Sequence, residues 1–521
     1  MPEDIMQIDL QNQLAFFLTG RRSSDSEPRP SAIRPALFAR YRDLTELRYD
    51  FPLVIAHGAP PEKTLRSLSR MVDDAALAAD ETDRLRLARH GQRIERAVRK
   101  HLAAKGPGDF ATVWHSCASE LVTEDAVIGD SAMTLWNSFA TDGDILDADA
   151  AMPARVVKAA WNSVQAEKAK QFNARTARLL HALKGILLAE DIGGGAGRSP
   201  ERLRSAVGSS FAGAFDFNEL SRILVSSKPA TALSDSRRDR INQLIATIEG
   251  QKFYTESGES IGFVFDNCAD AVRSHNERRA EAVKLLRALA IAELEAAGNY
   301  REKTHDVLFE NYGHNGLELS ELGQLPDYLI CTDGGAIDAA ETARIVEVLA
   351  AGLPFKILVR TDDVLEPSVV AEGHVALGLR SRQIVDASIG LTDVFVLQAA
   401  ASRLFANRAR LLSGLSYDGP ALFSVFSGAN GHTGDFSPYL VAAAAVESRV
   451  FPTITYDPSA GGDWASRLDI SDNPSTDDDW PVHRFAFEDA DLQSNSESLP
   501  FTPADFTALD DRFARHYSVA D

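Results

Sequence analysis

Two apolar segments in the C-terminal half of the chain are followed by acidic and small residues. The first, Tyr328–Cys331, leads into Thr332-Asp333-Gly334-Gly335. The second, Phe355–Val359, leads after one arginine into Thr361-Asp362-Asp363. A hard cation such as Mg²⁺ prefers carboxylate and carbonyl oxygens, and glycines let backbone N–H groups approach a phosphate. If the two segments end side by side, these residues could hold a magnesium ion with a diphosphate.

The elements that would position these residues form an α/β pattern. A helix-length segment separates the two strands, and loops that leave the carboxyl ends of adjacent parallel strands meet over one crevice. Strands separated by helices predict right-handed crossovers and a parallel sheet. The sequence therefore predicts a doubly wound, mainly parallel sheet in the C-terminal part, preceded by a mostly helical region. The further strands and helices expected are Val394–Leu397, 399–415, Ala421–Phe426, 437–448 and Thr453–Tyr456.

Changes in composition divide the chain into four expected segments. Residues 1–34 include a serine-, proline- and charge-rich stretch and are expected to be an arm or linker. Residues 35–257 carry apolar residues mostly at helical spacing. The strand–helix pattern begins near residue 320, and the family resemblance given below implies an α/β domain over residues 258–475. Residues 476–521 form an acidic tail with a short helix near 503–516.

Overall composition limits the classes of function. The formal net charge of −21 disfavours non-specific binding to nucleic acid. The three cysteines (Cys117, Cys268 and Cys331) lie far apart, which argues against an iron–sulfur cluster bound by this chain alone. No stretch of apolar residues is long enough to span a membrane, and we expect a cytoplasmic protein.

One segment, Arg84–Lys100, is rich in arginine and could contact nucleic acid or an acidic partner. Its own carboxylate and the negative charge of the chain favour a solvated helix face or a subunit contact.

The order of motifs from about residue 258 to 475 resembles the thiamine-diphosphate-binding domain of pyruvate:ferredoxin oxidoreductase and related 2-oxoacid oxidoreductases. The most specific match is the run Val446–Pro452 followed by Tyr456-Asp457-Pro458. Each other motif is weak alone, but their order extends over most of the domain. These other motifs are Ile261–Asp270, Thr332–Gly335, Val359–Val364 and Tyr417–Leu422.

The resemblance implies a cofactor site, from which this chain departs in part. It implies that Asp333, Gly334, Gly335, Thr361 and Asp362 bind thiamine diphosphate and Mg²⁺. Asp333 and Thr361 would be metal ligands, and Asp362 or Glu366 would replace an asparagine oxygen that the family has here. The family's Gly-Gly turn after this strand is missing. Extra carboxylates would repel a diphosphate unless the metal compensates.

A further loop, Gly428–Asp435, follows the strand Ala421–Phe426. The position at the carboxyl end of a strand would allow His432 to contact a cofactor, but the glycine-rich loop favours a structural turn.

The resemblance also implies an activity and partners. The chain would be a component of a 2-oxoacid:ferredoxin oxidoreductase-like complex, an oligomer that includes an iron–sulfur protein as electron relay. The catalytic glutamate that the family supplies from another domain has no convincing equivalent in the helical half. The alternative is a non-catalytic scaffold subunit that retains the fold without cofactor. A weaker third hypothesis is a nucleotide- or phosphate-binding enzyme that uses the same crevice.

Overall fold

The computed structural model describes residues 50–123, 125–139, 141–193, 199–207, 216–226, 233–255, 262–314, 316–367, 375–377, 379–434, 436–488 and 493–514. The expected arm, residues 1–34, therefore lies outside the described residues. Two compact units divide the chain: the first contains Met1–Val164, Gly262–Ala271 and Asp327–Asp521, and the second contains Gln165–Ile261 and Val272–Pro326. Both units are discontinuous in sequence, and two of the boundaries between them fall inside helices, one in α8 and one in α12.

The first unit begins with a small α+β subdomain. Its four strands pair in the order β2-β1-β4-β3, and every pair is antiparallel. The strands have only two to four residues, too few to show an alternating apolar pattern, so the sequence analysis missed this sheet. The elements in chain order are β1 (Leu53–Ala56), α3 (Pro61–Thr64), β2 (Leu65–Ser67), α4 (Leu68–Ala78), α5 (Glu81–Lys105), β3 (Gly108–Asp109), α6 (Phe110–Val122), α7 (Val127–Phe139) and β4 (Gly143–Leu146).

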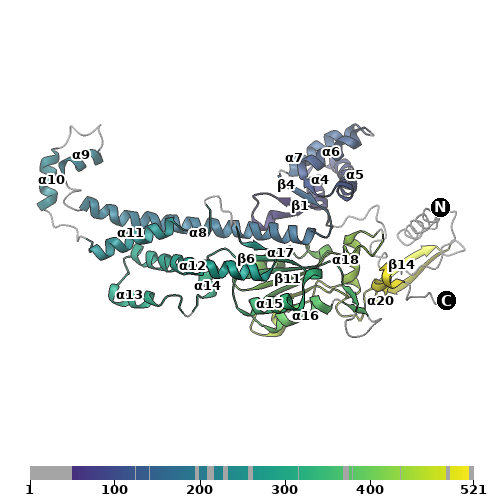
Figure 1. Cartoon of the computed structure of the whole chain (residues 1–521). Coiled ribbons are helices and arrows are strands. Elements are labelled where there is room, and N and C mark those ends of the chain that lie inside the picture. Colours follow the sequence, from purple (N-terminus) through teal and green to yellow (C-terminus); the bar gives the residue numbers. More distant parts are fainter. Residues whose placement is uncertain are drawn as a thin grey trace. The chain divides into compact units, whose positions relative to one another are not determined.

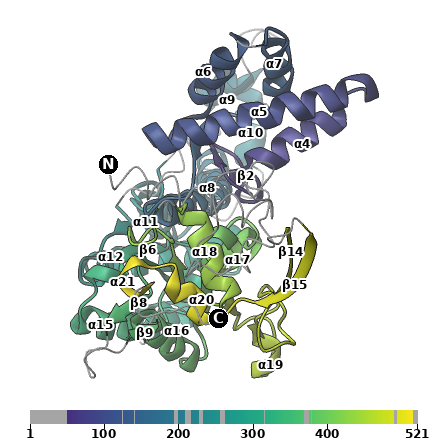
Figure 2. The same cartoon turned by 90° about the vertical axis from the view of Figure 1, so that its right-hand side faces the viewer.

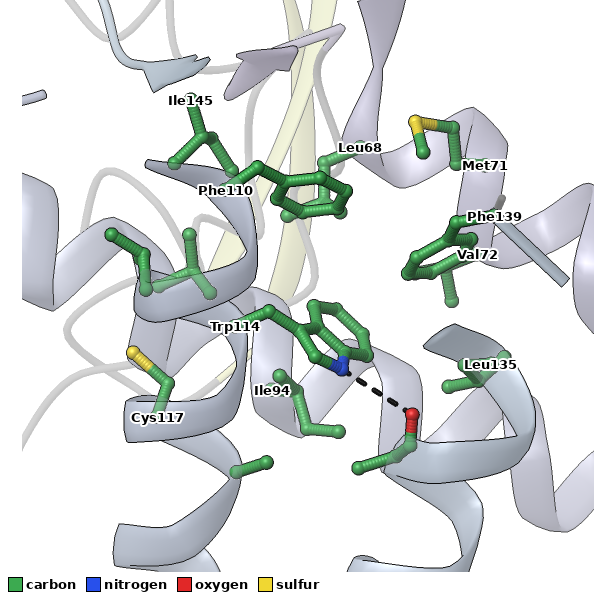
Figure 3. Packing of buried hydrophobic residues seen from close by; sticks show 14 of the residues in the cluster. Leu68, Met71, Val72, Ile94, Phe110, Trp114, Cys117, Leu135, Phe139 and Ile145 are labelled. Carbon is green, nitrogen blue, oxygen red and sulfur yellow. Dashed lines mark hydrogen bonds between the residues drawn. The ribbon is translucent and has the colours of Figure 1, made fainter. Parts of the chain in front are cut away.

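Aromatic rings fill the core of this subdomain. Trp114 on α6 is fully buried, and its indole N–H donates to the carbonyl of Ala132 on α7 at 3.3 Å (Figure 3). Helices α4 and α5 approach closely at Gly91, where a Cβ atom would lie 2.3 Å from a methyl carbon of Val72. Cys117 is buried in the same core, and burial raises the pKa of its thiol to about 11. Cys117 therefore packs as a small apolar residue of this core.

A seven-stranded sheet forms the centre of the C-terminal part (Figure 1). The strand order is β13-β12-β10-β11-β7-β6-β5, and the five strands from β10 to β5 run parallel. This confirms the predicted mainly parallel sheet in an α/β domain. The strands are β5 (Val264–Phe265), β6 (Tyr328–Asp333), β7 (Phe355–Thr361), β10 (Phe395–Ala400), β11 (Ala421–Phe426), β12 (Ile454–Tyr456) and β13 (Leu468–Asp469).

Two edge strands run against the others. Strand β12 pairs with β10 in the antiparallel direction, and β13 pairs antiparallel with β12. The sequence located the strand that ends at Tyr456, but an apolar pattern reports burial and not direction. The predicted helix over 399–415 is shorter in the structure, because β10 continues to Ala400 and helix α17 occupies only Arg408–Ser416.

Helices α15 (Ala339–Ala350), α16 (Leu379–Gly390), α17 and α18 (Pro438–Glu447) pack on this sheet. Every residue of α18 from Tyr439 to Glu447 is buried, including the alanine run that predicted close packing. The loop before α18 also approaches it closely. A Cβ atom on Gly428 would lie 2.1 Å from the Pro438 carbonyl oxygen, and its φ is +79°, so this position requires glycine.

The C-terminal segment returns to the same domain. A two-stranded hairpin of β14 (Val482–Glu488) and β15 (Ser494–Pro500) precedes helices α20 (Pro503–Ala508) and α21 (Asp511–Ala514). Figure 2 shows α20 beside α18, and the two helices are in contact. A second small hairpin joins β8 (Leu365–Pro367) to β9 (Val375–Leu377).

The second unit is helical in its described residues. Helix α11 is linked to α8 by the ion pair of Arg238 with Glu190 and to α12 by that of Arg237 with Glu295. None of the helices in the described ranges is long and apolar enough to cross a membrane. The helices of this unit are α8 (Met152–Gly193, in part), α9 (Pro200–Val207), α10 (Phe217–Ser226), α11 (Asp235–Glu249), α12 (Cys268–Ala296, in part), α13 (Glu302–Glu310) and α14 (Leu319–Leu322).

Candidate functional site

The carboxyl ends of β6, β7 and β11 lie side by side. Strands β6 and β7 are parallel neighbours with Asp333 opposite Arg360, and β7 and β11 are parallel neighbours with Thr361 opposite Phe426. The structure therefore brings together Asp333, Thr361 and Asp362, as the sequence analysis expected. This is the edge of a parallel sheet where ligands usually bind.

The turn after β6 approaches the end of β7 closely. A Cβ atom on Gly334 would lie 3.0 Å from both the Thr361 hydroxyl oxygen and the Arg360 carbonyl oxygen. Thr361 itself is buried. The Asp333 carboxylate accepts a hydrogen bond from the backbone N–H of Gly335 at 3.0 Å and thereby caps a short 3₁₀ turn, Gly334–Ala336. One oxygen of Asp333 is thus already used to hold its own turn.

Arg360 joins the two candidate metal-ligand carboxylates. Its guanidinium makes a close ion pair with Asp333 and a second one with Asp362 at 3.3 Å. Sequence reasoning missed this residue, although an arginine between an apolar strand and two aspartates was a visible signal. A cation therefore already stands between the carboxylates that were expected to bind Mg²⁺.

Asp362 also has a partner on β11's loop. The Ser427 hydroxyl donates to Asp362 at 2.6 Å and accepts from the backbone N–H of Ala429 at 3.1 Å. Burial raises the pKa of the Asp362 carboxyl above its ordinary value, and the Ser427 hydrogen bond and the Arg360 charge oppose that rise. The carboxylate is thus a fixed, partly desolvated group and not a free ligand.

A second arginine closes the same edge. Arg512 on α21 forms a bidentate pair with Asp363 at 2.7 and 3.0 Å and also binds Asp510 at 2.7 Å. Asp510 is buried, and it accepts from Asn430 at 3.3 Å. These contacts raise the pKa of Arg512, mainly through its hydrogen bond to Asp510. No sequence signal could have found this pair, because its members are far apart in the chain.

His432 lies on the exposed part of the loop after β11. Its backbone N–H donates to Asn430 at 2.9 Å, and its carbonyl accepts from the backbone N–H of Asp511 at 2.9 Å. The loop is therefore held as a turn against the C-terminal segment. These contacts account for the loop without requiring a ligand at the His432 imidazole.

The residues at this edge do not fit a magnesium diphosphate in their present arrangement. Among the described residues, no group of three or more histidine, cysteine, aspartate or glutamate side chains is arranged to hold a metal ion. The two aspartates share the Arg360 guanidinium, and the Thr361 hydroxyl is covered by the Gly334 turn. A metal ion could reach both carboxylates only if it displaced this guanidinium.

Comparison with known proteins does not assign the chain to a family. The sequence matches no model of a protein family, and no curated protein matches it. The resemblance to 2-oxoacid oxidoreductases therefore depends on the sequence motifs alone.

Proposed function

We propose that this chain is a non-catalytic subunit of a 2-oxoacid:ferredoxin oxidoreductase-like complex, in which a doubly wound thiamine-type domain serves as an interaction module. The observation that supports this proposal is the Arg360 guanidinium between Asp333 and Asp362. In this proposal the arginine replaces the metal ion as the positive charge that holds the two strand ends together.

Electrostatics favours the arginine over a metal ion at this position. Two carboxylates near one another repel unless a cation lies between them, and a planar guanidinium offers several donors in fixed geometry. Mg²⁺ demands near-octahedral geometry and releases its water reluctantly. Since Asp333 and Asp362 also bind Gly335 and Ser427 respectively, both carboxylates have partners without a cofactor.

A second candidate is an enzyme component that binds thiamine diphosphate and Mg²⁺ at the same strand ends. The adjacency of Asp333 and Thr361 at the ends of two parallel strands favours it. When bound, the cofactor would supply the carbanion chemistry of 2-oxoacid decarboxylation. An iron–sulfur protein and the catalytic glutamate would come from partner subunits of a cytoplasmic oligomer.

Calorimetric titration with thiamine diphosphate and MgCl₂ separates the two candidates. For the non-catalytic subunit we expect no saturable heat at millimolar ligand. Saturable, magnesium-dependent binding that is lost in Asp333→Ala would instead establish the enzyme component. Lys105→Glu, an exposed change on α5 far from these strands in sequence, is the matched control for folding and handling.

Affinity purification from the native host tests the assembly itself. Both candidates require stable association with other oxidoreductase subunits, including an iron–sulfur protein. Recovery of the chain without any such subunit, under conditions that preserve weak complexes, would overturn both.

A further inference from the structure

One face of helix α5 is basic over most of its length. Leu85, Arg89, Arg93, Arg96 and Lys100 are spaced by three or four residues, so they lie along one face of the helix. The opposite face carries the buried residues Leu87, Ile94 and Val98. We call the first set the basic face of α5. It contains no carboxylate, although the whole chain has a formal net charge of −21.

Most of this basic face has no counter-charge in the described part of the chain. Arg93 pairs with Asp125 at 3.2 Å, but Arg89, Arg96 and Lys100 are exposed and form no ion pair among the described residues. Leu85, on the same face, is 61% exposed. A solvated helix in an acidic protein usually carries charges of both signs, so this face has the composition of a contact surface.

A second surface in the same unit has the complementary composition. Strand β13 is an edge strand of the seven-stranded sheet, and it exposes Leu468 at 43%. Trp464, whose ring contacts Tyr456 at 5.5 Å, is 52% exposed, and Ile470 is 49% exposed. Leu468 pairs with Tyr456 in the strand register, which places Trp464 and Leu468 near one another. Edge strands with exposed apolar residues are sites where another chain can bind.

Carboxylates accompany these apolar residues. Asp463 is exposed and precedes Trp464, and the chain that leaves β13 exposes Asp477, Asp478 and Asp479. None of these four aspartates forms an ion pair in the described ranges. We call Asp463, Trp464, Leu468, Ile470 and Asp477–Asp479 the β13 surface.

The acidic segment of the β13 surface is held in place by the domain beneath it. The side chain of Asn473 donates to the carbonyl of Thr453 at 2.7 Å and accepts from its N–H at 2.8 Å. Arg449 donates to the carbonyl of Ser475 at 2.7 Å and also to that of Asp478. A surface that is ordered before binding loses less conformational entropy when a partner docks.

We propose that the basic face of α5 in one copy of the chain docks on the β13 surface of a second copy. In this contact Leu85 covers the apolar side chains around Trp464, and Arg89, Arg96 and Lys100 approach the aspartates. Both surfaces use the same combination of exposed apolar and charged groups, with opposite signs. The contact does not depend on whether the strand ends at Asp333 bind a cofactor.

The composition of the two surfaces argues for a second copy over nucleic acid as the occupant. A DNA backbone offers phosphates but no apolar side chains for Leu85, whereas the β13 surface of a second copy offers exposed aspartates beside Trp464 and Leu468. Salt alone cannot test this, because added salt weakens the ion pairs and also screens the repulsion between two acidic copies.

Sedimentation equilibrium of the full chain, with exchanged charges, tests the proposal. We expect a self-association that the Arg89→Glu/Arg96→Glu variant weakens about tenfold or more, since like charges would then face one another. Asp477→Lys/Asp478→Lys should weaken it similarly. An equimolar mixture of the two variants should recover much of the association, because each supplies the surface that the other has lost. A purely structural effect of either variant would not be rescued by mixing.

Two charge reversals outside the proposed contact serve as controls. Lys105→Glu lies on α5 away from the basic face, and Glu347→Lys lies on the exposed side of α15, so neither should change the association. A wild-type chain that stays monomeric at high concentration would overturn the proposal, as would association that ignores both double variants. Tight binding of a short DNA duplex that requires Arg89 and Arg96 would assign the face to nucleic acid instead.

Discussion

Each of the two units contains an ion cluster in which one charged side chain is shared by two side chains of opposite charge. In the helical unit, Glu295 on α12 is 1% exposed and is shared by two arginines of α11, Arg237 at 2.9 Å and Arg240 at 2.7 Å. At the strand ends of the first unit, the single Arg360 is shared by two aspartates, Asp333 and Asp362. In the helical cluster two arginines share one carboxylate, and in the strand-end cluster two carboxylates share one arginine.

The surroundings of the two clusters explain their different consequences. Arg240 also pairs with Glu302 on α13 at 3.1 Å and lies over the Tyr300 ring at 4.2 Å. The helical cluster therefore links α11 to both α12 and α13. Asp333, in contrast, is nearly half exposed. The helical cluster therefore stabilises the packing of α11 against α12 and α13, whereas the strand-end cluster is partly exposed to solvent.

The largest effect is expected from Glu295→Ala. This change leaves Arg237 and Arg240 without their buried partner and should lower the free energy of unfolding by about 3 kcal/mol. Urea denaturation followed by helical circular dichroism measures the loss. Glu293→Ala, which removes a half-exposed partner of Arg175, is the control and should cost about 0.5 kcal/mol. Equal losses for the two variants would show that the buried cluster contributes no more to the free energy of unfolding than an exposed ion pair.

Arg512→Ala should have the next largest effect, because it leaves the buried Asp510 carboxylate without its cation. We expect a loss of about 2 kcal/mol and faster hydrogen exchange in Pro503–Ala508. Mass spectrometry of exchanged peptides localises the change. Arg344→Ala on α15, an exposed arginine, is the control. Unchanged exchange in α20 would mean that the C-terminal segment is held by its apolar contacts alone.

The variant Arg360→Met tests whether the arginine takes the place of a metal ion between Asp333 and Asp362. The variant leaves Asp333 and Asp362 facing one another, so we expect a loss of about 1 kcal/mol, reduced by the partial exposure of both groups. Millimolar MgCl₂ should restore part of the loss in the variant and have no effect on the wild type. Equal effects of MgCl₂ on both proteins would contradict the view that the arginine takes the place of a cation.

The smallest effect concerns pH. Because burial raises the pKa of Asp362 in the folded chain, the stability that this group contributes is present at low pH and is lost as pH rises through the raised value. Relative to Asp362→Asn, the wild type should therefore lose stability from about pH 4 upward. Urea midpoints of both proteins across this range measure the difference. A difference that grows in the opposite direction would show that Arg360 outweighs burial.

Much of the C-terminal fold was predictable, and the reasons are local. Long apolar strands such as β7 and β11 are buried on both faces and therefore read as continuous apolar runs. The adjacency of Asp333 and Thr361 followed from a single strand–helix–strand unit. The four short strands of the N-terminal subdomain gave no pattern, and the direction of β12 depended on its pairing partner.

Only those residues of the candidate site that directly follow strands β6 and β7 could be predicted from the sequence. The aspartates and glycines stood directly after their strands, where sequence reasoning could find them. Arg360 was visible but was not weighed as a partner of its neighbours. Ser427, Asp510 and Arg512 reach the site through the tertiary fold, so only the three-dimensional structure could reveal that Asp333, Asp362 and Asp363 already have partners.

The discontinuity of the first unit has a consequence for biosynthesis. Phe51 is fully buried and contacts the Tyr439 ring at 5.6 Å, and Arg70 lies over the Phe405 ring at 5.0 Å. A ribosome releases the N-terminal subdomain long before the residues that cover it. We therefore expect nascent chains to expose this apolar surface until translation is nearly finished, and to need chaperone protection during that interval.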